Sequence, residues 1–113
     1  MVKKTKKEVK ECFRGGEGTV EFYHVLEPEE LRGHGQTYAM GVLKPHSSVG
    51  YHQHVGNGET FYILKGEGIF ADNDGSRIPV GPGDVCVIVP GESHGMENPT
   101  DEDLVYMALV INE

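Results

Sequence analysis

The length of 113 residues predicts one domain that buries roughly two thirds of the surface of its unfolded chain. The formal net charge is −8, yet the first ten residues hold five lysines and a single glutamate, so the rest of the chain is strongly acidic. An acidic body excludes nucleic acid as an expected partner, because phosphate binding requires a surface rich in Lys and Arg.

The lysine-rich start, residues 1–14, is expected to be a frayed, solvated tail ahead of a single domain over residues 15–113. It lacks the apolar run of a signal peptide, and no stretch of the chain is apolar for long enough to span a membrane. Cys12 and Cys86 stand too far apart in sequence to form a zinc knuckle or a redox pair. Two thiols without a secretory signal predict a cytoplasmic protein, and Cys86, within an apolar run, is interpreted as a buried, inert thiol.

Short apolar runs alternate with Gly, Pro, Asn and Asp, which is the pattern of an all-β sandwich or barrel. Thr19–Leu26 alternates and predicts a half-buried strand near a sheet edge. One helical turn is expected over residues 27–31, with Pro28 in its first turn. Gln36–Leu43 predicts the next strand.

The segment Val49–Val55 predicts a strand that presents His52 and His54 on one face, because side chains of a strand alternate with a period of two. A Gly-Asn-Gly turn follows, and Glu59 stands five positions after His54 at the start of another strand.

The second half of the chain predicts further short strands separated by turns. Asp-Gly at the end of Asp72–Gly75 is a strong hairpin signal. A later turn at residues 90–93 delivers His94, and Leu104–Ile111 predicts a final strand that is apolar on both faces. Because a strand with two apolar faces needs cover on both, this strand and the alternating Thr19–Leu26 favour a homodimer with two-fold symmetry.

If His94 comes from a distant strand, three imidazoles and one carboxylate converge. Burying such groups without partners costs several kcal/mol, which a bound metal removes. Nitrogen and oxygen ligands without sulfur suit Mn, Fe, Co, Ni, Cu or Zn, but not a closed structural zinc site. Three histidines and one glutamate leave about two open positions in an octahedral shell for substrate or dioxygen. The metal ligands are therefore predicted to be His52, His54, Glu59 and His94.

One carboxylate does not neutralise a divalent cation, so we expect a small anionic or chelating molecule as the ligand. By alternation, the pocket walls are predicted to include Phe61, Ile63 and Met96, with Met40 and Phe70 as further candidates for which core packing explains the residue equally well. The remaining histidines are interpreted as ordinary core or surface residues: His24, His34 and His46.

Two motifs resemble those of the cupin superfamily. His52-x-His54, four residues, Glu59, six residues and Gly66 match the first motif, although His46 stands where the family has its leading glycine. The second motif is matched by this chain's Gly83, Val89-Pro90-Gly91, His94 and Asn98, with Val89 in place of a proline. The resemblance covers about residues 36–111 and implies a small monocupin with a double-stranded β-helix, or jelly-roll, barrel.

Within that family, the ligand set resembles the manganese sites of oxalate decarboxylases and germin-like oxalate oxidases, and those of some dioxygenases. The resemblance implies a metal-dependent enzyme, with manganese as the first expectation, that acts on a small carboxylate or enolisable substrate. No catalytic residue is identified, because decarboxylases also need a proton donor on a mobile lid and Tyr51 should point away from His52.

Two alternatives stay open. The first is a non-catalytic, metal-assisted binding or sensor module. The second is a sugar-phosphate isomerase, which ranks lowest because phosphate binding needs basic residues at the mouth. The core region offers only Lys44, Lys65 and Arg77 for that purpose.

Overall fold

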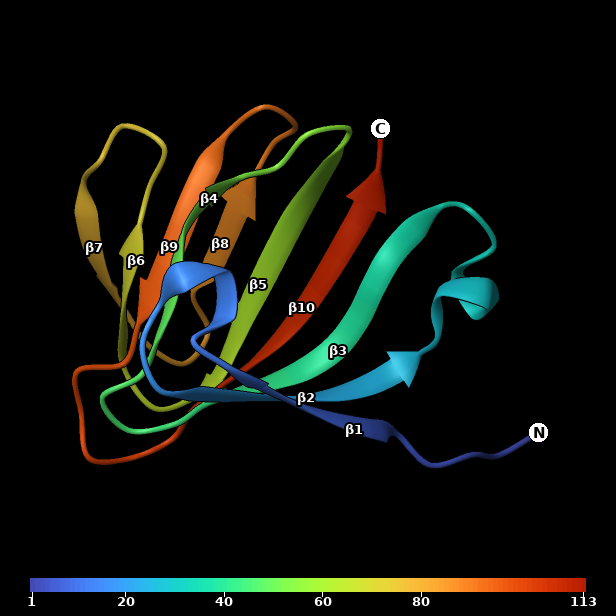
Figure 1. The fold of residues 1–113 in the computed structure, drawn as a ribbon, viewed down its shortest axis with the longest axis horizontal. Coiled ribbons are helices and arrows are strands. Elements are labelled where there is room, and N and C mark those ends of the chain that lie inside the picture. The colour runs from blue at the N-terminus through green and yellow to red at the C-terminus, as the bar shows by residue number, and fades with distance from the viewer.

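Ten strands and two short 3-10 helices (η1 and η2) form the computed structural model, which describes residues 1–113 (Figure 1). In chain order the elements are β1 Lys6–Glu11, η1 Phe13–Gly15, β2 Thr19–Leu26, η2 Pro28–Leu31, β3 Gly35–Leu43, β4 Ser48–Gln53, β5 Asn57–Lys65, β6 Gly68–Ala71, β7 Arg77–Val80, β8 Val85–Ile88, β9 Ser93–Glu97 and β10 Leu104–Asn112. The predicted all-β class is confirmed, as are the helical turn at η2 and the hairpin that joins β6 to β7.

The strands form two antiparallel sheets. The larger sheet has the order β1-β2-β3-β10-β5-β8, and the smaller has the order β4-β9-β6-β7. Figure 1 shows the smaller sheet and β8, β5 and β10 as two walls, with η1 beside β4. The core lies between these walls, where inward side chains of both sheets meet, and includes Phe61, Met96 and Tyr106.

The N-terminal segment is not the frayed tail that the sequence predicts. Lys6–Glu11 forms β1 and pairs with β2, from Lys6 opposite His24 to Glu11 opposite Thr19. β2 is therefore not at the sheet edge. The free edge of β2 offers unpaired backbone groups, which β1 satisfies although its side chains are solvated. The domain boundary at residue 14 stays a prediction.

β10 lies in the middle of the larger sheet, between β3 and β5. Its inward positions include Tyr106 and Ala108, which are 1% exposed, whereas Met107 and Leu109 point out of the other face of the sheet. The apolar residues on one face of β10 therefore pack in the core, and those on the other face lie on the outside of the larger sheet. No helix of the structure is long and apolar enough to cross a membrane.

Candidate metal centre

Four predicted ligands meet between the two sheets. His52 on β4 lies directly opposite His94 on β9 in the smaller sheet, and Glu59 extends from β5 in the larger sheet. His54 lies one residue past the end of β4, yet its backbone continues the ladder, because its N–H donates to the Glu92 carbonyl at 2.9 Å. One potential ligand atom from each of the four side chains lies within 4.8 Å of the others.

The shortest distances in this cluster join three of the four groups. Nε2 of His54 lies 3.0 Å from Nε2 of His94, and Oε1 of Glu59 lies 3.1 Å from the first nitrogen and 3.2 Å from the second. Adjacent ligands of an octahedral ion with bonds of about 2.1 Å are separated by about 3 Å. The donor set and its spacing therefore fit a divalent metal.

Hydrogen bonds fix the ring nitrogens that remain free for a metal. Nδ1 of His52 donates to the Gly50 carbonyl at 2.7 Å, and Nδ1 of His54 donates to the amide oxygen of Asn57 at 2.5 Å. In a neutral imidazole, the proton on Nδ1 leaves the lone pair of Nε2 free to coordinate. His94 is 1% exposed, and its Nδ1 has no hydrogen-bond partner.

The electrostatic environment shifts the pKa values of His52 and His54 in opposite directions. Burial lowers the pKa of His52, and the neighbouring His94 and the positive charge of Arg14 act in the same direction. The hydrogen bond with Glu59 raises the pKa of His54. Burial alone would raise the pKa of the Glu59 carboxyl. The hydrogen bonds with His54 and His94 lower this pKa by more, so it lies below its ordinary value. Glu59 is thus a buried anion that needs a positive partner, either a proton shared with the imidazoles or a cation.

A cavity of about 120 Å³ extends from this cluster. Of the five predicted wall residues, Phe61 lines it, and its ring centroid lies 5.4 Å from that of His94. Ile63, Phe70 and Met96 are buried in the core instead. The prediction that Met40 lines the pocket is wrong. Its side chain points out of the opposite face of the sheet, while its neighbour Gly41 faces the interior.

Four charged or ionisable side chains on the cavity wall were not predicted as site residues. Glu8 and Lys10 come from β1, Arg14 comes from η1, and His24 comes from β2. His24, interpreted as an ordinary residue, is hydrogen-bonded to Glu8 at 3.1 Å. A signal for this segment was available: the glycines at 15, 16 and 18 predict a turn that would let the preceding residues return along β2.

The other singled-out residues lie outside the cavity. His46 is paired with Asp101 at 2.6 Å, and the hydroxyl of Tyr51 donates to backbone carbonyls of Asp72 and Asn73, away from the cluster as expected. Cys86 is buried, and burial raises the pKa of its thiol to about 11, so it carries no thiolate near neutral pH.

Comparisons with known proteins agree with this geometry. The family profile of the cupin domain matches residues 39–111. An oxalate-binding protein of Thermotoga maritima is 46% identical over 98 residues, which span 87% of this chain and 80% of that protein. The crystal structure of a predicted oxalate decarboxylase from Thermotoga maritima matches with a TM-score of 0.91 at 42% identity, over 96% of this chain and 94% of that chain.

A more distant structure shows the fold alone. The polyketide cyclase RemF of Streptomyces resistomycificus matches with a TM-score of 0.79 at 20% identity, over 100% of this chain and 81% of that chain. The two antiparallel sheets and these matches establish the double-stranded β-helix. The chain belongs to the cupin-domain family.

Proposed function

We propose that this protein is a metal-dependent cupin that binds a small carboxylate of the oxalate class on a divalent ion. The observation that carries the proposal is the convergence of His52, His54, Glu59 and His94 at the wall of a cavity. Manganese is the first expectation among the metals that accept nitrogen and oxygen ligands. The names of two relatives, an oxalate-binding protein and a predicted oxalate decarboxylase, support the class of ligand.

The protein's own residues would prepare the site in three ways. The hydrogen bonds to Gly50 and Asn57 orient the rings of His52 and His54. Glu59 supplies one negative charge, so a divalent ion keeps a net positive charge for an anionic ligand. Phe61 forms part of an apolar wall that limits water in the cavity. A bound ion would supply Lewis-acid polarisation of the carboxylate.

We favour an enzyme over a binding module because an ionisable pair, His24 and Glu8, lines the same cavity. Such a pair offers a place for proton exchange with a bound substrate. Decarboxylase-like and dioxygenase-like reactions both fit a small carboxylate. The binding module stays the second candidate, because one relative is described only as oxalate-binding.

The sugar-phosphate isomerase is disfavoured by the cavity. Its volume of about 120 Å³ is small for a phosphorylated sugar. None of the basic residues considered from the sequence lines it, namely Lys44, Lys65 and Arg77. Lys10 and Arg14 line it instead, so the small volume is what disfavours a phosphorylated sugar.

Removal of the metal tests the proposal. Protein stripped with a chelator should show no oxalate binding by titration calorimetry, and reloading with Mn²⁺ should restore it, because the open coordination positions hold the carboxylate. His94→Ala should lower the affinity for Mn²⁺ by at least about tenfold. His46→Ala, a histidine outside the cavity, is the matched control and should bind Mn²⁺ and oxalate as the wild type does.

Oxalate binding of equal affinity in the stripped and reloaded protein would refute the metal-dependent function. Formate and CO₂ release, measured together with dioxygen consumption, separates the candidates. Release without dioxygen consumption identifies a decarboxylase, and oxalate binding without product identifies the binding module.

We also infer a homodimer, on grounds that differ from the predicted ones. β2 and β10 are not sheet edges. The support is instead the outer face of the larger sheet, defined by Met40, Tyr62, Val85, Val87, Met107 and Leu109. The cytoplasmic location stays a prediction.

A further inference from the structure

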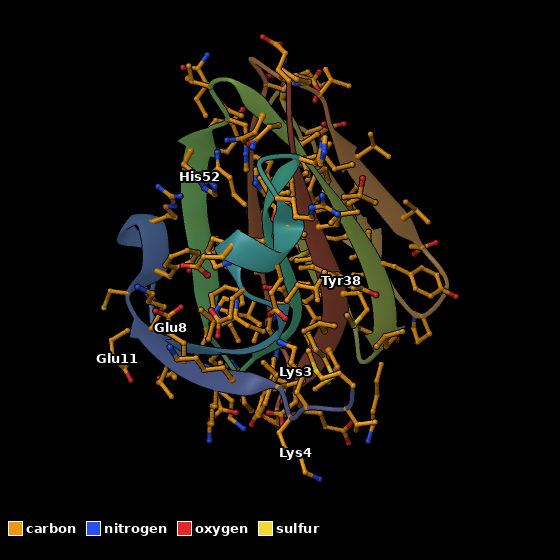
Figure 2. All side chains as sticks on the ribbon, turned by 90° about the vertical axis from the view of Figure 1, so that its right-hand side faces the viewer. Lys3, Lys4, Glu8, Glu11, Tyr38 and His52 are labelled. Atoms are coloured by element: carbon orange, nitrogen blue, oxygen red, sulfur yellow. The ribbon has the colours of Figure 1, made fainter.

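The N-terminal segment is held against the strand that carries His52. A Cβ on Gly50 would collide with the Arg14 carbonyl oxygen, so the backbones of η1 and β4 are in contact there. Ser48 N–H donates to the Glu17 carbonyl at 2.8 Å. Figure 2 shows Glu8 and His52 on one side of the molecule, with the η1 ribbon beside them. This segment is therefore a fixed wall of the metal cavity.

Arg14 is a cation on this wall without an anionic partner. Its guanidinium carbon lies 5.4 Å from the ring centroid of Phe13, and Phe13 packs edge-on against Phe22 at 5.3 Å. All three residues line the cavity, and no carboxylate of the chain forms an ion pair with Arg14. Its backbone φ is +56°, a conformation that costs a non-glycine residue about 1 kcal/mol or more. Local strain beside a cavity is a feature of ligand sites.

The charges around the cavity favour a dianion. Lys10 and Arg14 offset Glu8 and Glu59, so a divalent ion would leave two net positive charges when the histidines are neutral. Lys10 lies 3.4 Å from Glu8 and is partly neutralised by it. Arg14 is thus the free cation that a second negative group of a ligand would meet.

We propose that Arg14 binds the second carboxylate of a ligand whose first carboxylate is on the metal, so that the cavity selects short dicarboxylates over monocarboxylates. This selectivity rests on the proposed metal-dependent function. The planar guanidinium can donate two parallel hydrogen bonds to one carboxylate, which Lys cannot do. The cavity volume of about 120 Å³ suits a small dicarboxylate.

The test compares Arg14→Gln with the wild type in the Mn²⁺-loaded protein. Oxalate affinity should fall about 10- to 100-fold, because a hydrogen bond to a charged group is lost. Acetate affinity should change by less than about threefold, because the metal position is intact. Mn²⁺ affinity should not fall, because the substitution removes a positive charge near the ligand histidines, whereas a structural defect of the wall would lower it. Arg14→Lys should lose part of the oxalate affinity, since it keeps the charge but not the paired donors.

Arg32→Gln is the matched control. Arg32 has the same left-handed backbone, with φ of +57°, and lies outside the cavity. It should bind oxalate as the wild type does. If the wild type binds oxalate with Mn²⁺ and Arg14→Gln binds it equally well, the selectivity proposal is wrong and the metal-dependent function stands. If the loaded wild type binds no carboxylate, the proposed function fails first.

Discussion

Asn98 connects three segments at the end of the barrel. It is 1% exposed, and the two hydrogens of its amide nitrogen are shared among the carbonyls of Leu43, Lys44 and Glu102, at 2.9, 3.1 and 2.7 Å. Its amide oxygen accepts from the backbone N–H and the hydroxyl of Thr100. One side chain thus satisfies the backbone groups that a buried loop would otherwise leave unpaired.

Asn98→Ala should lower the free energy of unfolding by about 3 kcal/mol, because the carbonyls lose their donor in a buried site. Asn98→Asp keeps the acceptor oxygens but loses the donors, so this substitution should lower the free energy of unfolding by a similar amount. Urea unfolding of the metal-free variants measures both. Asn73→Ala is the control: its exposed side chain accepts one hydrogen bond, from Ser93 N–H, and should cost less than about 1 kcal/mol. Equal losses for Asn98→Ala and Asn73→Ala would contradict this role.

At the scale of single residues, the sequence predicts the metal cluster because its ligands follow local spacing. His52 and His54 lie two positions apart on one ladder, and Glu59 follows a tight turn. Arg14 has no comparable signal. Its side chain reaches the cavity through a left-handed turn whose conformation is stabilised by contact with β4, a contact between residues distant in sequence.

At the scale of the element, β3 and β10 are joined by a close contact at Gly41. A Cβ on Gly41 would lie 2.5 Å from the ring of Tyr106, which is 1% exposed and lines the cavity. The ring fills the space that a side chain at position 41 would need. Burial also raises the pKa of the Tyr106 hydroxyl, which therefore stays protonated.

Gly41→Ala should lower the free energy of unfolding by about 2 kcal/mol, because the added methyl group must displace a ring that the core holds in place. Gly81→Ala is the control, since the nearest atom to its Cβ would be 4.0 Å away and its φ is not positive. It should change the stability by less than about 0.5 kcal/mol. A measured loss below 0.5 kcal/mol for Gly41→Ala would show that the sheet yields at this point.

Strands are predictable here where apolar alternation is flanked by turn residues, as in Thr19–Leu26. β1 fails this criterion because five of its six residues are charged and the sixth, Val9, is exposed. It forms by pairing with the backbone of β2, which no local pattern specifies. The error left Glu8 and Lys10, the two cavity-lining residues of β1, out of the predicted site.

At the scale of the whole molecule, the outer face of the larger sheet is unusual for a surface. Tyr62 is 48% exposed, and Val85 and Val87 are each 56% exposed. The register places them in adjacent rows with Met107 on β10, and no charged residue stands among the six positions of this face. An antiparallel sheet with one solvated face normally alternates apolar and polar residues, so this face is expected to be covered.

A second copy of the chain is the partner that fits. The face spans four neighbouring strands and two outward rows, roughly 20 by 14 Å. It would form the apolar centre of an interface whose standard size is about 800 Å² per partner. Two such faces related by a two-fold axis would pack as a β-sandwich core, at an angle of about 30°. A charged partner would find no charged side chain among the six residues of this face with which to form an ion pair.

Val87→Lys should therefore convert a dimer into a monomer at micromolar concentration, because two-fold symmetry introduces two buried charges at each interface. Light scattering coupled to size exclusion measures the mass of each variant. Val55→Lys makes the same change at a 75% exposed loop position outside the outer face, so it should remain dimeric. A monomeric wild type would refute the interface altogether. A Val87→Lys protein that stays dimeric would move the interface to another surface, and retained Mn²⁺ binding in both variants would show that the barrel is folded.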